Sequence, residues 1–275
     1  VISHIMIGML ATRTSTRLES PPLVSMRGVT KTFANGTTAL AGLDLDIRPG
    51  EFVSLLGPSG CGKSTALRLI AGLAEVSSGH VEWPLSRSGD PHAEIGFVFQ
   101  EPTLMPWANA ADNVWLPLRL RGVSRREAEP RIAEGLARVG LSGFDHAYPR
   151  ELSGGMKMRV SIARALSVRP KLLLMDEPFA ALDEITRFRL NDDLLRLQRE
   201  LGCTVVFVTH SVYESVYLSN RIIVMAARPG RVVAEIDVDA PRVRDESFRS
   251  DPLYAELCRR TSQALHGAMS PDEHL

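Results

Sequence analysis

The sequence predicts an α/β fold with a mostly parallel core sheet flanked by helices, an antiparallel β subdomain and a helical subdomain. A buried strand, a glycine-rich loop and a helix follow one another over residues 51–71. The segments Lys171–Asp176 and Thr204–Thr209 are apolar at nearly every position, which is typical of parallel strands covered on both faces. Residues 23–47 instead alternate apolar and polar side chains around the hairpin signal Asn35-Gly36, which indicates antiparallel strands.

The chain of 275 residues is long enough for one large domain with smaller appended parts. We expect the main domain at 23–240, with its helical subdomain at about 101–165, where the apolar period becomes helical. Residues 1–22 are predicted to be a disordered extension, and residues 241–275 a helical tail.

The composition narrows the class of protein. The formal net charge is +0 at pH 7, so there is no basic excess to attract nucleic acid. The 3 cysteines lie far apart and form no metal-binding or redox pair, which fits a reducing, cytoplasmic setting. No apolar run approaches the roughly 18 residues of a membrane-spanning helix, so any membrane role is expected to come through partner chains.

The glycine-rich loop matches the phosphate-binding pattern G-x-x-x-x-G-K-[ST]. Its glycines allow the backbone to wrap a phosphate, and the following helix N-terminus supplies positive potential. Lys63 is expected to reach the β- and γ-phosphates of a nucleotide, and the Ser64 hydroxyl to ligate Mg²⁺. The alternative, an ordinary turn with a stray lysine, does not account for the flanking strand and helix. The predicted ATP-binding residues of this loop are Gly57, Pro58, Ser59, Gly60, Cys61, Gly62, Lys63, Ser64 and Thr65.

Two acidic residues end the apolar strand at 172–176. A buried strand that ends in a carboxylate presents it at the edge of the sheet, beside the phosphate loop. We expect Asp176 to hold Mg²⁺ and Glu177 to polarise the attacking water. The alternative is that both acids simply terminate a strand.

A second glycine pair, Gly154 and Gly155, follows Ser153 and precedes a helix that is expected to begin near Lys157. Two glycines before a helix N-terminus can form another anion-binding site, although Ser-Gly-Gly alone is an ordinary turn. The helical segment 159–166 and the acidic strand that follow this turn favour an anion-binding site over an ordinary turn.

Together these motifs resemble the ATP-binding subunit of an ABC transporter over about residues 23–240. The matching segments, in the family's order, are Gly57–Thr65 (Walker A), Gln100 (Q-loop), Leu152–Met156 (signature), Leu172–Asp176 (Walker B), Ala181–Asp183 (D-loop) and Thr209-His210 (switch histidine).

The resemblance implies a head-to-tail homodimer that encloses two ATP molecules. The partner subunit would supply Ser153, Gly154, Gly155 and Asp183 to each ATP. A single subunit cannot easily bring two anion-binding loops to one γ-phosphate, which agrees with this arrangement.

Three further roles are implied by the resemblance. Gln100 would sense Mg²⁺ and the γ-phosphate, His210 would contact the γ-phosphate and orient Glu177, and Phe33 would stack on adenine. The alternatives are a strand-end polar residue, a structural histidine and a core phenylalanine, respectively. Met156, Phe33 and Ala180 depart from the family's usual residues, but no essential acid or donor is missing, so an active ATPase is expected.

The segments Gln100–Asn109, Asp112–Val114 and Leu152–Arg159 resemble the importer group for nitrate, sulfonates and taurine. Related importers carry bicarbonate, cyanate or vitamin precursors. The implied partners are two integral-membrane permease subunits and a periplasmic or lipid-anchored solute-binding protein, with this chain peripheral at the cytoplasmic face of the inner (plasma) membrane. Met105, Pro106 and Trp107 could line the groove for the permease; alternatively, Trp107 packs inside the helical subdomain.

Other functions are disfavoured. A soluble clamp on nucleic acid or ribosomes usually carries two ATPase units, a coiled coil or zinc modules, and none of these is recognisable in the sequence. A non-catalytic scaffold conflicts with the presence of Glu177 and His210, and an exporter half fits the Trp107 segment less well.

Overall fold

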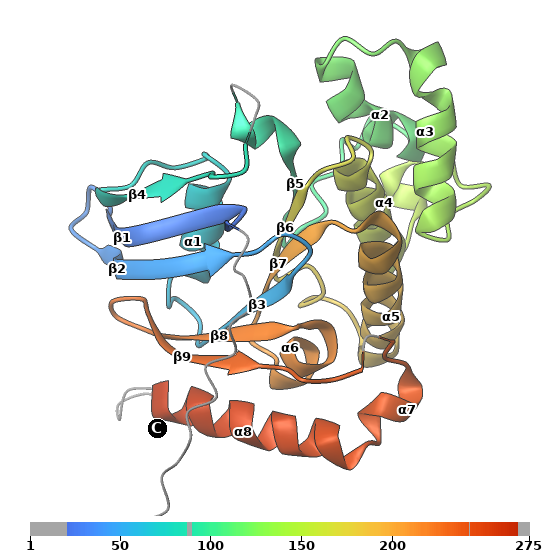
Figure 1. Ribbon diagram of the computed structural model, residues 1–275. Coiled ribbons are helices and arrows are strands. Elements are labelled where there is room, and N and C mark those ends of the chain that lie inside the picture. The colour runs from blue at the N-terminus through green and yellow to red at the C-terminus, as the bar shows by residue number, and fades with distance from the viewer. Residues whose placement is uncertain (1–20, 87–89, 242, 269–275) are drawn as a thin grey trace, which may run out of the picture.

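A computed structural model describes residues 21–86, 90–241 and 243–268. Its central sheet has the strand order β5-β6-β7-β3-β8-β9 (Figure 1). The pairs β5–β6, β6–β7, β7–β3 and β3–β8 are parallel, whereas β9 pairs with β8 antiparallel at one edge. The strands are β3 (Phe52–Leu56), β5 (Ile95–Val98), β6 (Leu172–Asp176), β7 (Thr204–Thr209), β8 (Arg221–Ala226) and β9 (Arg231–Asp237).

A second, antiparallel sheet has the order β2-β1-β4. It contains β1 (Val24–Thr32), β2 (Thr38–Ile47) and β4 (Ser78–Glu82). The turn between β1 and β2 is closed by a hydrogen bond from the Phe33 amide to the Thr37 carbonyl, and Gly36 adopts φ 82° within it. The predicted α/β fold with a mostly parallel core sheet and an antiparallel part is therefore confirmed.

The helices occupy three stretches of the chain. Among the described residues, the first helix follows the phosphate loop, the next five lie between β5 and β8, and the last two follow β9. They are α1 (Lys63–Ile70), α2 (Ala110–Leu120), α3 (Arg125–Arg138), α4 (Gly154–Leu166), α5 (Glu184–Leu201), α6 (Val212–Leu218), α7 (Glu246–Arg249) and α8 (Pro252–Ala268), with short 3-10 turns at Pro91–Glu94 and Pro149–Glu151.

Two hydrophobic cores lie on opposite faces of the central sheet. Successive side chains of a strand point to opposite faces, and β6 illustrates this. Leu172 and Leu174 join the core that contains α1, β1 and β2, whereas Leu173 and Met175 join the core that contains α2 to α6 and α8. In Figure 1, α1 and the antiparallel sheet accordingly lie on one side of β6 and β7, and α4 and α5 on the other.

Helix α4 begins earlier than the sequence predicts. It starts at Gly154 rather than near Lys157, because the Ser153 hydroxyl accepts a hydrogen bond from the Met156 amide and caps the helix. The two glycines therefore form the first turn of α4. A Cβ atom on Gly155 would lie 2.8 Å from Cγ2 of Thr186, so this turn approaches the start of α5 closely.

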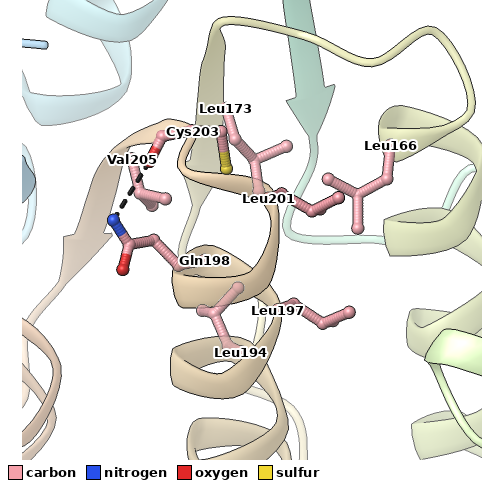
Figure 2. A pocket seen from close by; sticks show the side chains of 8 residues that line it. All are labelled: Leu166, Leu173, Leu194, Leu197, Gln198, Leu201, Cys203 and Val205. Atoms are coloured by element: carbon pink, nitrogen blue, oxygen red, sulfur yellow. Dashed lines mark hydrogen bonds between the residues drawn. The ribbon is translucent and has the colours of Figure 1, made fainter. Parts of the chain in front are cut away.

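The far end of α5 is closed by tight packing. Figure 2 shows Leu194, Leu197 and Leu201 of α5 around an apolar niche completed by Leu166, Leu173, Cys203 and Val205. Beside it, the Gln198 amide donates to the carbonyl of Cys203 at 3.1 Å and to that of Gly50 at 3.1 Å. The niche leaves no room for a water-sized molecule, so its side chains serve to pack the helix.

Helix α8 packs beneath α6, β8 and β9, and α7 packs against the start of α8 (Figure 1). The buried Arg244, just before α7, donates to the carbonyls of Val216, Tyr217 and Ser219 at the end of α6. Arg249 lies over the Tyr217 ring at 3.8 Å from its centroid. The predicted extension at 1–22 falls almost entirely outside the described residues.

Within the described parts of the chain, no helix has both the length and the apolar character required to cross a bilayer.

Candidate functional site: a nucleotide-binding loop and its acidic edge

The phosphate loop joins β3 to α1 and depends on glycine at two points. Gly62 caps α1 in the left-handed conformation at φ 91°, and a Cβ there would lie 2.6 Å from Leu40 and 2.7 Å from the Ala39 carbonyl. A Cβ on Gly57 would lie 2.5 Å from the Met225 carbonyl oxygen. The loop therefore holds its shape only without side chains at these points, and it directs the N-terminus of α1 at its own interior.

Lys63 is the buried cation of this loop, with 4% of its surface exposed. Its ammonium group donates to the carbonyl oxygens of Gly57 at 2.8 Å and Pro58 at 2.9 Å. Glu177 Oε1 lies 3.8 Å away. A buried positive charge at the mouth of a glycine-rich loop is suited to bind phosphate oxygens.

Ser64 and Asp176 provide adjacent oxygen donors. The Ser64 hydroxyl donates to Asp176 Oδ1 at 2.7 Å, across the space between α1 and the end of β6. Burial raises the pKa of Asp176, and the hydrogen bond from Ser64 partly offsets that effect. A hydroxyl and a carboxylate at this spacing match the oxygen ligands that Mg²⁺ prefers, so these residues fit the ion.

Glu177 lies directly after β6 and faces His210, which follows β7. Its Oε2 is 3.1 Å from His210 Nδ1. The backbone of Glu177 adopts φ 46°, which is uncommon for a residue with a side chain, and its amide donates to the Val208 carbonyl at 3.1 Å. The carboxylate thus lies between the Lys63 ammonium on one side and the His210 ring on the other.

The structure brings together Lys63, Ser64, Asp176, Glu177 and His210 from α1, β6 and β7. Each is joined to another of the group by a hydrogen bond or an ion pair. The β5–β6 pairing, in which Val98 lies opposite Met175, directs the chain after β5 to the same edge of the sheet. Gln100, two residues after β5, is exposed there.

Other predicted residues make no hydrogen bond or ion pair with this group within the described part of the chain. Ser153 and Gly154 are exposed at the start of α4, and Asp183 is exposed at the start of α5, where it accepts a hydrogen bond from the Thr186 amide. Phe33 is 44% exposed, so it is not a core phenylalanine, and Lys31 Nζ lies 5.6 Å from its ring centroid.

The structure adds two residues that the motifs do not single out, Glu214 and Arg187, and shows how Thr209 contacts them. Thr209 donates its hydroxyl hydrogen bond to the buried carboxylate of Glu214 at 2.6 Å, and Arg187 lies next to that carboxylate. The spacing of Ser211 and Glu214, which is typical of a helix-capping pair, is the sequence signal that could have found Glu214.

A phosphate loop at the carboxyl edge of a parallel sheet, with an acidic pair beside it, defines a P-loop nucleotide hydrolase. The family model described as ABC transporter matches residues 40–180. The chain belongs to the ABC transporter family.

Named relatives and a solved structure agree with this assignment. The chain is 46% identical over 237 residues to the aliphatic sulfonates import ATP-binding protein SsuB 1 of Pseudomonas syringae pv. syringae, covering 86% of this chain and 92% of that protein. It is 44% identical over 233 residues to the taurine import ATP-binding protein TauB of Rhizobium johnstonii, covering 83% and 89%. The dimeric ATP-binding cassette MJ0796, solved in a post-hydrolysis state with ADP and Pi, aligns with TM-score 0.68 and 36% identity over 79% of this chain and 100% of that one.

The chain is therefore an ABC ATPase subunit that binds and hydrolyses ATP with Mg²⁺.

Proposed function

We propose that Glu177 is the general base of ATP hydrolysis and that His210 orients it. The observation that supports this most strongly is the position of the Glu177 carboxylate, 3.8 Å from the Lys63 ammonium and 3.1 Å from the His210 ring. The cation faces the phosphate loop, so a water held by the carboxylate is directed at a phosphate bound there. The left-handed backbone of Glu177 accompanies the side-chain position in which the carboxylate contacts both Lys63 and His210.

The other residues of the group bind and orient the nucleotide. Lys63 and the backbone N–H groups of the loop at 57–65, all but that of Pro58, which has none, hold the phosphates. Ser64, Asp176 and Gln100 hold Mg²⁺. When bound, Mg²⁺ neutralises charge on the phosphate oxygens. The exposed Phe33 ring offers a flat apolar face for adenine.

We also propose that the site is completed by a second copy of the chain in head-to-tail orientation. The phosphate loop and α1 belong to the core on one face of the sheet, whereas α4, which carries the signature residues, belongs to the core on the other face. Ser153, Gly154 and Asp183 are exposed, so they are free to contact the ATP of a partner. Gly155 allows α4 and α5 to approach each other, which keeps these donors together.

The partners proposed beyond the dimer are two permease subunits in the inner membrane, served by a solute-binding protein. A groove of about 300 Å³ lies beside the chain that follows Gln100. Its lining includes Phe97 and Phe99 of the β5 region and Leu116, Pro117 and the exposed Leu120 of α2. An apolar helix from a permease fits such a groove. Trp107 does not pack inside the helical region, because 76% of its surface is exposed, and Met105, Pro106 and Trp107 do not line the groove.

The solute is proposed to be a small sulfonate of the taurine type. The relatives named for sulfonate and taurine import are 46% and 44% identical to this chain. The chain would act at the cytoplasmic face of the membrane, where ATP is available.

The test is a pull-down of the tagged Glu177→Gln protein with Mg-ATP from gently solubilised native membranes. We expect a polytopic membrane protein in the eluate, identified by mass spectrometry, because the closed dimer should remain bound to its permease. Leu120→Asp in the same background should lose that protein. Recovery of ribosomal or nucleic-acid-associated proteins instead would contradict the importer function.

A further inference from the structure

Both residues that flank His210 are tied to one carboxylate. The Thr209 hydroxyl donates to Glu214 Oε2 at 2.6 Å, and the same hydroxyl oxygen accepts from the Ser211 amide at 3.0 Å. The Glu214 amide in turn donates to the Ser211 hydroxyl at 3.3 Å. Glu214 therefore holds the side chain of Thr209 directly, and through that side chain it holds the backbone amide of Ser211.

This arrangement differs from an ordinary capping box. In a capping box the acid of the third helical residue accepts from the amide of the capping residue itself. Here the Ser211 amide donates to Thr209 instead, and Thr209 passes the interaction on to Glu214. The Thr209 hydroxyl lies between the Ser211 amide and the Glu214 carboxylate. Thr209, the residue before His210, thereby becomes part of the cap of α6.

Glu214 also lies next to the start of α5. It is buried, with 8% of its surface exposed, and burial raises its pKa. Arg187 Nε lies 3.8 Å from Glu214 Oε1, and neither of these two buried atoms makes a hydrogen bond within the described part of the chain. Arg187 Nη2 donates to the Leu182 carbonyl at 2.9 Å, directly before Asp183.

We propose that Glu214 is a positioning residue for His210, and that Arg187 links it to the segment 181–183 that carries Asp183. The inference rests on the proposed roles of Glu177 and His210. Its basis is the chain of contacts from the Leu182 carbonyl through Arg187, Glu214 and Thr209 to the amide of Ser211, the residue after His210. A displacement of the segment 181–183 by a partner subunit would move Arg187 relative to Glu214, and so alter how firmly His210 is held against Glu177.

The cost of burying Glu214 argues for such a role. A carboxylate taken out of water needs a close cation and further hydrogen bonds to be compensated, and this one has a hydroxyl and a guanidinium at 3.8 Å. A glutamine or an apolar residue would cap or pack α6 at lower cost. A carboxylate at this position is explained if its function is to attract the Arg187 guanidinium.

The first experiment compares Glu214→Gln with the unaltered full-length chain in steady-state ATP hydrolysis. The amide oxygen of glutamine can still accept from Thr209 but no longer attracts Arg187. We expect kcat to fall about tenfold, because small misplacements of a catalytic group have effects of this order, while KM for ATP stays within about twofold. Arg187→Gln should lower kcat in the same direction and add little to Glu214→Gln.

A matched pair at Thr209 guards against a variant that merely fails to fold. Thr209→Val keeps the shape and removes the hydroxyl, whereas Thr209→Ser keeps the hydroxyl. We expect Thr209→Val to lower kcat as much as Glu214→Gln does, and Thr209→Ser to keep kcat near that of the unaltered chain. The midpoints of thermal unfolding should not rank the variants in the same order as kcat does.

The decisive experiment measures the effect of Glu214→Gln on the single-turnover rate of ATP hydrolysis in a protein that also carries His210→Ala. If Glu214 acts through His210, Glu214→Gln should have almost no further effect there. An equal loss in both backgrounds, or unchanged kcat in Glu214→Gln and Thr209→Val, would overturn the inference. Turnover that survives in Glu177→Gln would instead overturn the proposed base, so the two failures are distinguishable.

Discussion

Glu177 combines an unusual backbone with a functional side chain. A left-handed φ of 46° costs a residue with a side chain roughly 1 to 2 kcal/mol relative to the right-handed conformation. The hydrogen bond from its amide to the Val208 carbonyl and the contacts of its carboxylate offset that cost. The sequence shows that an acid follows the strand, but it does not show the backbone conformation that aims this acid.

Glu177→Gln should abolish steady-state ATP hydrolysis, by about 100-fold or more, because the amide cannot accept a proton from water. ATP binding should persist, since Lys63 and the loop amides remain. Turnover is measured by phosphate release and binding by equilibrium dialysis. Glu256→Gln, an exposed change on α8, is the control; unchanged turnover in the Glu177 variant would refute its role as base.

Gly62→Ala should destabilise the protein more than Gly60→Ala. Both glycines have positive φ, at 91° and 78°, so both variants carry backbone strain of about 1 kcal/mol. Only at position 62 would the new Cβ also collide with Leu40 and the Ala39 carbonyl, whereas nothing lies within 4 Å at position 60. Urea unfolding of both variants measures the difference; equal losses would mean that strain alone determines the effect.

At the scale of elements, the chain between β5 and α2 is held by two polar side chains. Arg164 of α4 donates to the carbonyls of Pro102 and Thr103, and the fully buried Asn113 of α2 hydrogen-bonds both the amide and the carbonyl of Met105. This segment follows Gln100 and borders the groove proposed for the permease. Because Arg164 belongs to α4, these hydrogen bonds join the segment beside the groove to the helix that carries the signature residues.

Arg164→Ala should loosen the loop at 101–109 and lower the free energy of unfolding by about 2 kcal/mol, because hydrogen bonds to a charged group are lost. Amide hydrogen exchange at residues 101–109 should accelerate, while exchange in β7 should not. Arg259→Ala, which removes an exposed arginine of α8, is the control. Unchanged exchange in the loop would mean that Asn113 alone holds it.

Elements with a strong local pattern were predictable, and elements defined by distant contacts were not. The strands β6 and β7 are apolar on both faces, so their sequence indicates them within a residue or so. β4 is short and mostly exposed, and its pairing with β1 is the reason it forms a strand. The link between Arg187 and Glu214 joins α5 to α6, and no local pattern predicts that two such residues meet.

At the scale of the whole molecule, the C-terminal tail after β9 contacts α6, the helix that begins just after His210. Arg244 caps the end of α6, and α6 begins directly after His210 and Ser211. Burial lowers the pKa of Arg244 to about 10, so the guanidinium remains charged at neutral pH. The tail therefore stabilises α6, which carries Glu214, both through Arg244 and through the packing of α8 against α6.

Arg244→Ala should lower the free energy of unfolding by about 3 kcal/mol, because three carbonyl groups at the end of α6 lose a charged donor. Urea unfolding measures the loss, with Arg260→Ala on the exposed face of α8 as the control. A change no larger than in the control would show that water replaces the guanidinium at those carbonyls.

The two cores also have a consequence for how the strands find their alignment during folding. Because β6 is buried on both faces, a slip by one residue would exchange one set of apolar side chains for another and change hydrophobic burial little. A slip that moves each residue of β6 one place back would, however, move Asp176 away from the sheet edge and draw Glu177 into the sheet, where an uncompensated carboxylate is costly. The acids that serve ATP hydrolysis thus also penalise misaligned strands, so replacing both by apolar residues would remove a determinant of correct folding along with the chemistry.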